Sequence, residues 1–135
     1  MQPGPGVGGH CIAVDPWFIV NRSPQESKLI RTAREVNDSK PEWVINRVLQ
    51  CAHKFKDPII ACLGLTFKAD VDDLRESPAL NIVNKLSEIS VGKILVCEPN
   101  LDEYDGFDLV DFKDAVNQAD IILLLVDHKI FRESK

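Results

Sequence analysis

The sequence contains no long hydrophobic run. Its longest uninterrupted apolar stretch, Ile121 to Val126, has six residues, whereas about 20 are needed to span a bilayer. Nothing at the beginning of the chain resembles a signal peptide. With 44% hydrophobic residues in a length of 135, the composition is that of a globular protein with a core. We therefore expect a cytoplasmic protein without a membrane partner.

Positive charge is scarce in the second part of the chain. Residues 58–135 carry eight Lys/Arg against fifteen Asp/Glu, whereas residues 1–57 carry eight against six, and the net charge of the whole chain is −5. The acidic part would repel a phosphate backbone. Nucleic acid is therefore not an expected partner, and an anionic small ligand would need a local positive site.

The four cysteines show no CxxC spacing, which gives little support for disulfides or a metal site. Cys62 and Cys97 lie in short apolar runs that look like buried strands, where cysteine behaves as a small hydrophobic residue. Cys51 lies in a helical pattern and is interpreted in the same way. Only Cys11 lies outside an apolar strand or helix, so it is the one candidate nucleophile.

The glycine-rich stretch at residues 4–9 lacks the context of the common nucleotide-binding motifs. A dinucleotide-binding fingerprint follows a strand, and only three residues precede Gly4; no Gly-Lys-Ser/Thr follows, as a P-loop would require. Four glycines in six positions leave few side chains to block access to Cys11. We interpret the stretch as a loop that presents this thiol, with Asp15 four residues later. A mobile loop at a chain terminus would look the same.

Helical periodicity follows this loop. Pro16 to Val20 could open a short helix capped by Asp15. From residue 24 onward, the apolar residues fall on one helical face, which comprises Leu29, Ile30, Ala33 and Val36. The segment Asn37 to Pro41 predicts a break or kink, after which the pattern continues to about residue 55. Residues 1–57 offer no surface large enough to cover these helices, which could pack on the second part, on a missing domain or on another subunit.

Residues 58–135 alternate between apolar strands and helices. Strands are predicted near residues 59–64, at 93–97 and at 120–126, with helices at about 78–89 and 112–118. Repeated strand and helix units with continuously apolar strands favour a parallel sheet covered on both faces. The expected fold class is α/β: a helical segment, residues 1–57, followed by a partial Rossmann-like parallel sheet, residues 58–135.

The loop after the first predicted strand, residues 64–77, is a second candidate site. In such sheets ligands bind outside the carboxyl ends of the strands, and Ser77 with Pro78 predicts a helix N-terminus that points at the same crevice. With Lys68 and Arg75 nearby, the loop is a candidate phosphate site. It could instead be a solvated loop whose basic residues neutralise its aspartates, and a metal site built from those aspartates is not expected.

The sequence gives little indication of a role for the three histidines. His10 adjoins Cys11 and could tune its reactivity, although neighbours on an extended loop point apart. His53 and His128 are interpreted as helix-surface or loop residues without a role.

Two separate stretches resemble one known family. Residues 4–18 read GPGVGGHCIAVDPWF and residues 64–79 read GLTFKADVDDLRESPA, and the segment AREVND at residues 33–38 lies between them. All three are similar to the nucleotide-sugar 6-dehydrogenases, the UDP-glucose/GDP-mannose dehydrogenase family. The wording HCIAVDPW at residues 10–17 looks most like the UDP-N-acetyl-D-mannosamine dehydrogenase branch.

This resemblance implies a three-part protein. The family joins an NAD-binding domain, a central helical dimerisation domain and a C-terminal UDP-binding domain. Residues 1–57 would then be the catalytic loop and part of the central domain, and residues 58–135 would be part of the UDP-binding domain. By the same resemblance the chain is a fragment that lacks the domain holding most of the NAD, and a homodimer through its helical segment is expected.

The resemblance also implies roles for the cysteine loop. The family oxidises a sugar C6 alcohol to a carboxylate with two NAD and a covalent thiol intermediate. Cys11 would capture the C6 aldehyde as a thiohemiacetal and later hold the thioester, as suits a good nucleophile and leaving group. Asp15 would help to arrange the water and the catalytic lysine that hydrolyse the thioester. The family's catalytic lysine, asparagine and glutamate are expected upstream of residue 1, so the chain alone is expected to be catalytically silent.

The remaining roles that the resemblance implies concern binding. Gly8 would line the sugar pocket through its backbone, Phe67 and Lys68 would contact the UDP-sugar substrate, and Arg75 would reach toward NAD. The same reaction on UDP-glucose, UDP-GlcNAc or GDP-mannose is an alternative. Two others are a module serving chiefly for dimerisation through residues 24–55 and a stand-alone nucleotide-binding or flavodoxin-like regulatory domain.

Overall fold

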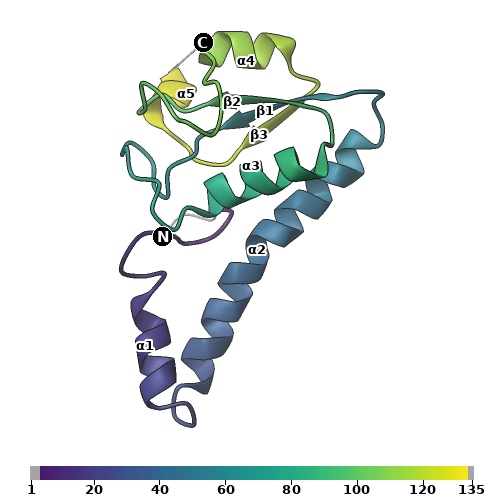
Figure 1. Ribbon diagram of the computed structural model, residues 1–135. Helices are drawn as coiled ribbons and strands as arrows, with labels where there is room; N and C mark the ends of the chain where they lie inside the picture. The colour runs from purple at the N-terminus through teal and green to yellow at the C-terminus, as the bar shows by residue number, and fades with distance from the viewer. Residues whose placement is uncertain (1–3, 134–135) are drawn as a thin grey trace.

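The computed structural model describes residues 4–133, and the outermost residues of both predicted domains, 1–3 and 134–135, lie outside the described part. A helical arm is followed by a small α/β sheet unit (Figure 1). The arm consists of α1 (Asp15–Arg22) and the N-terminal half of α2 (Lys28–Ala52), and the C-terminal half of α2 packs on the sheet unit. No helix in residues 4–133 is both long and apolar enough to cross a membrane.

The short helix α1 begins at Asp15, the residue that was expected to cap it. Val14, not Asp15, occupies the N-cap position, and no side chain caps the helix there. The turn before α1 is already helical, because the backbone N–H groups of Val14 and Asp15 both donate to the Cys11 carbonyl, at 3.0 and 2.8 Å. The prediction that Asp15 caps α1 is therefore wrong, and Asp15 lies in the first turn as an exposed residue.

Helix α2 is continuous through the segment where a break or kink was predicted. Pro41 lies inside it and is buried. A proline removes one backbone donor, and the turn before it carries an ion pair between Arg34 and Asp38, 2.6 Å apart. The C-terminal half is also held by packing, since Ile45 and Val48 belong to the core of the sheet unit.

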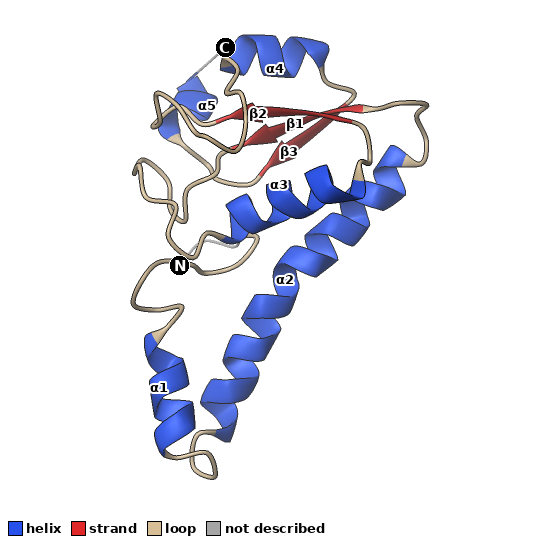
Figure 2. Ribbon diagram, in the orientation of Figure 1, coloured by secondary structure: helices blue, strands red, loops and turns tan. Residues whose placement is uncertain are grey.

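The sheet has three parallel strands in the order β2-β1-β3 (Figure 2). In chain order the elements are β1 (Ile59–Leu63), α3 (Pro78–Ile89), β2 (Lys93–Cys97), α4 (Phe112–Gln118), β3 (Ile121–Leu124) and α5 (Lys129–Glu133). The predicted strands and the two predicted helices are present, and α5 was not predicted. The strand order reverses at β1, because β2 lies on one side of it and β3 on the other. This arrangement confirms the predicted α/β class with a Rossmann-like parallel sheet.

Side chains of β1 alternate between two cores. Ile60 and Cys62 belong to a cluster with α2 and α3, whereas Ala61 and Leu63 belong to a cluster with α4. Both clusters are almost fully buried, as the apolar strands predicted. Coverage is incomplete only at the edge strand β3, whose Ile122 and Leu124 are about half exposed, because α4 packs against β1 and β2.

Candidate functional site

The glycine-rich loop packs directly against the segment that follows Thr66, so the two candidate sites form one surface. A Cβ atom on Gly8 would lie 2.1 Å from the carbonyl oxygen of Glu76, and one on Gly9 would lie 3.0 Å from the Phe67 ring. Gly9 also has φ +91 and donates its N–H to the Arg75 carbonyl, at 3.2 Å. Only a chain without side chains could approach so closely. The glycines are therefore needed for contact between the two loops.

Asn37 holds the other side of the same loop. Its side-chain oxygen accepts from the Val7 N–H at 2.8 Å, and its side-chain nitrogen donates to the Val7 carbonyl at 3.2 Å. This amide therefore pairs with the backbone of Val7 in both directions. Sequence reasoning missed the contact and interpreted Asn37 as part of a helix break; an asparagine amid a confident helical pattern was the available signal.

Cys11 is exposed at the end of the glycine-rich loop. Its carbonyl accepts from Asp15 in a helical i to i+4 bond, so the two side chains lie one turn apart on the same side of the chain. The other cysteines differ. Cys62 and Cys97 are buried, and burial raises the pKa of their thiols to about 12 and about 11. Their predicted role as small hydrophobic residues is confirmed.

Phe67 and Lys68 lie on the loop that faces the glycines. The Phe67 N–H donates to the Asp73 carbonyl at 3.0 Å, which closes the loop on itself, while its ring contacts Gly9. Lys68 is exposed, and its carbonyl accepts a hydrogen bond of 2.8 Å from the Thr66 hydroxyl. The loop therefore presents one aromatic ring to the glycine-rich loop and one cation to solvent.

Arg75 is engaged by a neighbouring carboxylate. Its Nε and Nη2 donate to Asp73 at 2.6 to 3.0 Å. The side-chain hydrogen bonds, followed by the one from the Arg75 backbone N–H, lower the pKa of Asp73 to about 2. The hydrogen bonds to Asp73, and to a smaller degree the charge of Cys11, raise the pKa of Arg75. Arg75 thus lies near the Cys11 thiol, but Asp73 already neutralises its charge. This pairing is what the alternative of a solvated loop, with basic residues that neutralise its aspartates, predicted for Arg75.

The start of α3, where an anion site is predicted, contacts the glycine-rich loop. The Ser77 hydroxyl caps the helix as predicted, accepting from the Leu80 N–H at 3.3 Å. Pro78 packs against the glycine-rich loop, where a Cβ on Gly6 would lie 3.1 Å and one on Gly8 2.8 Å from its ring. The glycine-rich loop therefore lies against this helix end, and a phosphate site formed with Lys68 and Arg75 stays a prediction.

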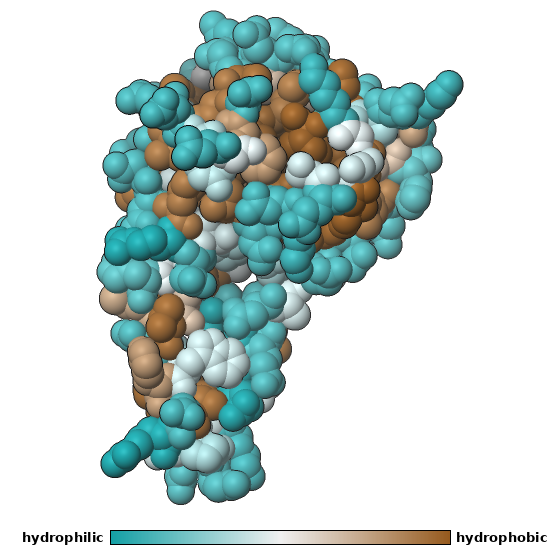
Figure 3. Space-filling model, viewed as in Figure 1, coloured by the Kyte–Doolittle hydropathy of each residue, from teal (hydrophilic) through white to brown (hydrophobic). Residues whose placement is uncertain are grey.

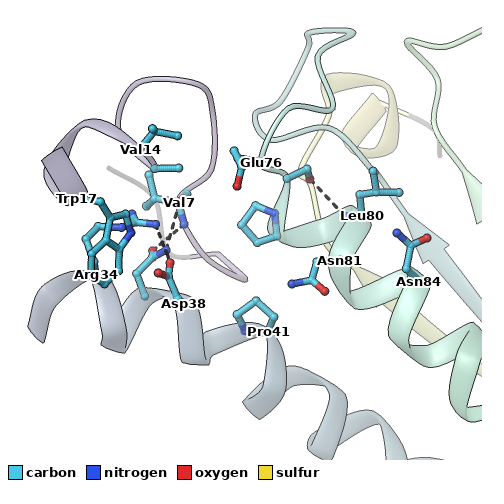
Figure 4. A pocket seen from close by; sticks show the side chains of 14 residues that line it. Val7, Val14, Trp17, Arg34, Asp38, Pro41, Glu76, Leu80, Asn81 and Asn84 are labelled. Atoms are coloured by element: carbon cyan, nitrogen blue, oxygen red, sulfur yellow. Dashed lines mark hydrogen bonds and ion pairs between the residues drawn. The ribbon is translucent and has the colours of Figure 1, made fainter. Parts of the chain in front are cut away.

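A cavity of about 550 Å³ lies between α1, α2 and α3 (Figure 4). Asn81 and Asn84 of α3 face Arg34 and Asp38 of α2 across it, and Val7 lies at its edge. The Nε of Arg34 is buried and has no hydrogen-bond partner in the described part of the chain. Neither Cys11 nor Phe67 lines this cavity, so it is separate from the exposed thiol.

A buried polar network at the carboxyl ends of the strands was missed. Glu98, 3% exposed, follows β2, and its Oε2 accepts from the N–H groups of Leu65 and Thr66, at 2.7 and 3.3 Å. His128, 0% exposed, follows β3, and its Nε2 lies 3.2 Å from the same oxygen. An acidic residue directly after a parallel strand was an available signal for Glu98. His128 gave none: it lies in a loop, one of the two placements predicted for it, but it is fully buried.

No group of three or more His, Cys, Asp or Glu side chains within residues 4–133 is placed to hold a metal ion. Of the loop aspartates, Asp73 binds Arg75 and Asp70 accepts from the Lys129 N–H at 3.0 Å.

Comparisons with known proteins match both parts of the chain. Residues 61–135 match the model of the UDP binding domain of the UDP-glucose/GDP-mannose dehydrogenase family, and residues 1–39 match that of its central domain. Among curated relatives, an "NDP-N-acetyl-D-galactosaminuronic acid dehydrogenase" from Ralstonia solanacearum is 56% identical over 98% of this chain and 32% of its own length. A "UDP-N-acetyl-D-mannosamine dehydrogenase" from Campylobacter jejuni is 51% identical over 98% of this chain and 34% of its own length.

A solved structure agrees with these relatives. The UDP-N-acetyl-mannosamine dehydrogenase from S. aureus is 41% identical, with a TM-score of 0.84, and the match covers 98% of this chain and 31% of that one. The chain spans about a third of the length of the curated relatives it matches.

Proposed function

The chain belongs to the UDP-glucose/GDP-mannose dehydrogenase family, and from this premise we propose that it supplies the thiol and UDP-binding parts of an NAD-dependent enzyme that oxidises UDP-N-acetyl-D-mannosamine at C6. The observation that carries the proposal is the direct packing of the glycine-rich loop on the Phe67 loop, with Cys11 exposed where they meet. Residues 1–57 then belong to the central domain and residues 58–135 to the UDP-binding domain.

The proposed chemistry at C6 uses the exposed thiol. The Cys11 sulfur adds to the C6 aldehyde to give a thiohemiacetal, which protects the aldehyde from release. After the second oxidation the sulfur holds a thioester, and water displaces it to give the carboxylate and the free thiolate. Asp15, whose backbone N–H donates to the Cys11 carbonyl, would help to orient that water. Gly8, without a side chain, lets the sugar lie against the backbone.

NAD would accept the electrons removed from C6 in both oxidations. In this chain the residue proposed to reach it is Arg75, whose side chain is 63% exposed and close enough to Cys11 for the two charges to interact. An exposed cation beside the thiol suits an anionic cofactor, and the Arg75 guanidinium would then bind both the cofactor and Asp73. Lys68, which is exposed on the neighbouring loop, is proposed to contact the diphosphate of the substrate, and Phe67 the sugar.

A binding experiment tests this proposal on the chain itself. Titration calorimetry with UDP and UDP-N-acetylmannosamine is expected to show binding by the wild-type chain. Gly8→Ala should weaken it by at least about tenfold, because the new methyl group would displace the loop from Glu76 at a cost of about 1–3 kcal/mol. Gly4→Ala is the matched control, since nothing lies within 4 Å of its Cβ position.

The same titration separates the rival functions. UDP-glucose, UDP-GlcNAc and GDP-mannose test other sugars of the family, and UDP-N-acetylgalactosamine is added because of the name of the Ralstonia relative. Binding of FMN without any UDP-sugar would favour the flavodoxin-like alternative. Equal affinities of the Gly4→Ala and Gly8→Ala variants for UDP-N-acetylmannosamine would contradict the proposed sugar site.

We also propose that the chain forms a homodimer through its helical arm. The predicted apolar face of α2 is largely uncovered in residues 4–133: Leu29 is 82% exposed and Val36 65% exposed. Apolar residues on α1 are exposed as well, namely Phe18 at 68% and Ile19 at 51%. Figure 3 shows hydrophobic patches on the helical arm, with hydrophilic residues around them. Several large apolar side chains exposed on one short arm are typical of a protein interface.

Sedimentation velocity tests the homodimer. The wild-type chain is expected to sediment as a dimer, and Leu29→Glu with Val36→Glu as a monomer, because two desolvated charges in an apolar interface cost several kcal/mol. Ile89→Glu is the control, since Ile89 is 51% exposed but lies at the end of α3. A monomeric wild-type chain, or a dimer that survives both arm substitutions, would contradict this interface.

A further inference from the structure

The strand order places a topological switch point at the carboxyl ends of β1 and β3. Because β2 and β3 lie on opposite sides of β1, the chain leaves the sheet in opposite directions there, and open α/β sheets commonly bind ligands in that crevice. Here the crevice is filled from within by Glu98 and His128, both almost fully buried. The Leu65 and Thr66 N–H groups, which could otherwise bind an anion, already donate to Glu98.

The buried imidazole has one arrangement of its proton. The backbone N–H of Asp70 donates to His128 Nδ1 at 2.9 Å, and a backbone amide cannot reverse its role. Nδ1 is therefore an acceptor, so the proton is on Nε2, from which it is donated to Glu98 Oε2 at 3.2 Å. The Asn100 side-chain nitrogen, 2.9 Å from Nδ1, is a second donor to the same atom.

These bonds act on the loop that carries Phe67 and Lys68. Asp70 has φ +60, a left-handed conformation that a residue with a side chain rarely adopts without support. Support comes from His128 at its N–H and from the Lys129 N–H, which donates to its carboxylate at 3.0 Å. At the other end of the loop, the Thr66 hydroxyl lies 3.5 Å from Nε2 and donates to the Lys68 carbonyl.

We propose that His128 is a positioning residue: its imidazole, as the Nε2–H tautomer, clamps residues 66–70 to the ends of β2 and β3 and so fixes Phe67 and Lys68 opposite the glycine-rich loop. The clamp itself is independent of any ligand, whereas its consequence for substrate rests on the function proposed above. The two nitrogens have separate tasks. Nδ1 holds the loop through Asp70, and Nε2 anchors the ring to Glu98.

Two substitutions separate these tasks. An asparagine amide can replace Nδ1 as acceptor, whereas a glutamine amide reaches the position of Nε2. Amide hydrogen exchange should therefore show that the Asp70 N–H is protected in the wild type and in His128→Asn. In His128→Gln it should exchange at least about fivefold faster, because the loss of one hydrogen bond changes the opening equilibrium by about that factor. The Ala61 amide in β1 reports global stability, and His53→Gln, at an exposed histidine, is the control variant.

A measurement without substitution guards against variants that fail to fold. Nitrogen-15 chemical shifts of the wild-type imidazole are expected to identify the Nε2–H tautomer; an Nδ1–H tautomer, or an Asp70 amide that exchanges as fast as an unstructured one, would overturn the clamp. Titration with UDP-N-acetylmannosamine then tests its consequence, with weaker binding expected for His128→Gln than for His128→Asn. Should the exchange pattern hold while no variant binds any UDP-sugar, the clamp stands and the proposed function fails.

Discussion

Replacing Cys11 with serine is expected to lower the turnover of the proposed dehydrogenase reaction by at least about 10³-fold. A serine hydroxyl is a much weaker nucleophile than a thiol near neutral pH, so the C6 aldehyde would not be captured. An alkoxide is also a poorer leaving group than a thiolate, so any acyl intermediate would hydrolyse slowly. The exposed position of Cys11 at the junction of the two loops makes it the sulfur that substrate can reach.

The measurement is NADH formation from UDP-N-acetylmannosamine by a chimera. In it, residues 4–133 of this chain replace the matching segment of the Campylobacter relative, with which the chain is 51% identical over 140 residues. Cys51→Ser is the matched control, because Cys51 is a partly buried cysteine of α2, whereas Cys11 is exposed at the end of the glycine-rich loop. The unsubstituted chimera and Cys51→Ser should have similar turnover, within about twofold.

Two results would contradict the role of Cys11. One is an inactive chimera with intact folding, which would mean that these residues cannot serve the reaction. The other is a Cys11→Ser chimera with turnover close to that of Cys51→Ser. A further readout is the appearance of aldehyde in the medium, expected only when Cys11 is absent, because the thiohemiacetal otherwise retains it.

Two structural features of the candidate site, the exposure of Cys11 and the cap of α3, were predictable because local sequence determines them. The local patterns are a run of glycines without a preceding strand, one cysteine outside any apolar segment, and the Ser77-Pro78 start of a helix. In the structure Cys11 is exposed and α3 is capped by Ser77. Strand and helix ranges in residues 58–135 were predictable for the same reason, since apolar runs and helical periodicity are short-range signals.

Contacts between distant segments were not predictable. Asn37 and Val7 are 30 residues apart, and His128 and Glu98 are also 30 apart. In the sequence, each looked like an ordinary polar residue of a helix or loop, because its partner is set by the order of the strands and by the path of α2. The continuity of α2 through Pro41 was not predictable for the same reason, because it also depends on distant contacts. Tertiary packing of Ile45 and Val48 outweighs the local cost of the proline.

Replacing Glu98 with glutamine is expected to destabilise the chain by about 3 kcal/mol at pH 7. The carboxylate of Glu98 accepts from His128, from Asn100 and from two backbone N–H groups after β1. A glutamine amide offers only one acceptor oxygen, and its NH₂ group would point at donors that have no other acceptor. The cost would therefore exceed that of a single lost hydrogen bond.

The destabilisation caused by Glu98→Gln should depend on pH within a defined range. Burial alone would raise the pKa of Glu98, but the hydrogen bonds from His128 and from the Leu65 and Asn100 N–H groups outweigh it and lower the pKa from 4.5 to about 2. A carboxyl with a lowered pKa in the folded state contributes stability above the unfolded pKa, and that contribution is lost as the pH falls from about 5 to about 2. The shift corresponds to about 3 kcal/mol.

Urea unfolding followed by circular dichroism at pH values from 7 to 2 checks this expectation. The difference in free energy of unfolding between the wild type and Glu98→Gln should be largest at pH 7 and should shrink steadily below pH 5. Glu103→Gln is the control, because Glu103 is an exposed carboxylate in the same acidic loop, and its difference should stay within about 0.5 kcal/mol throughout. A Glu98→Gln difference that stays constant down to pH 2 would show that the charge of Glu98 does not hold the ends of β1, β2 and β3 together, and the clamp on the Phe67 loop would lose its anchor.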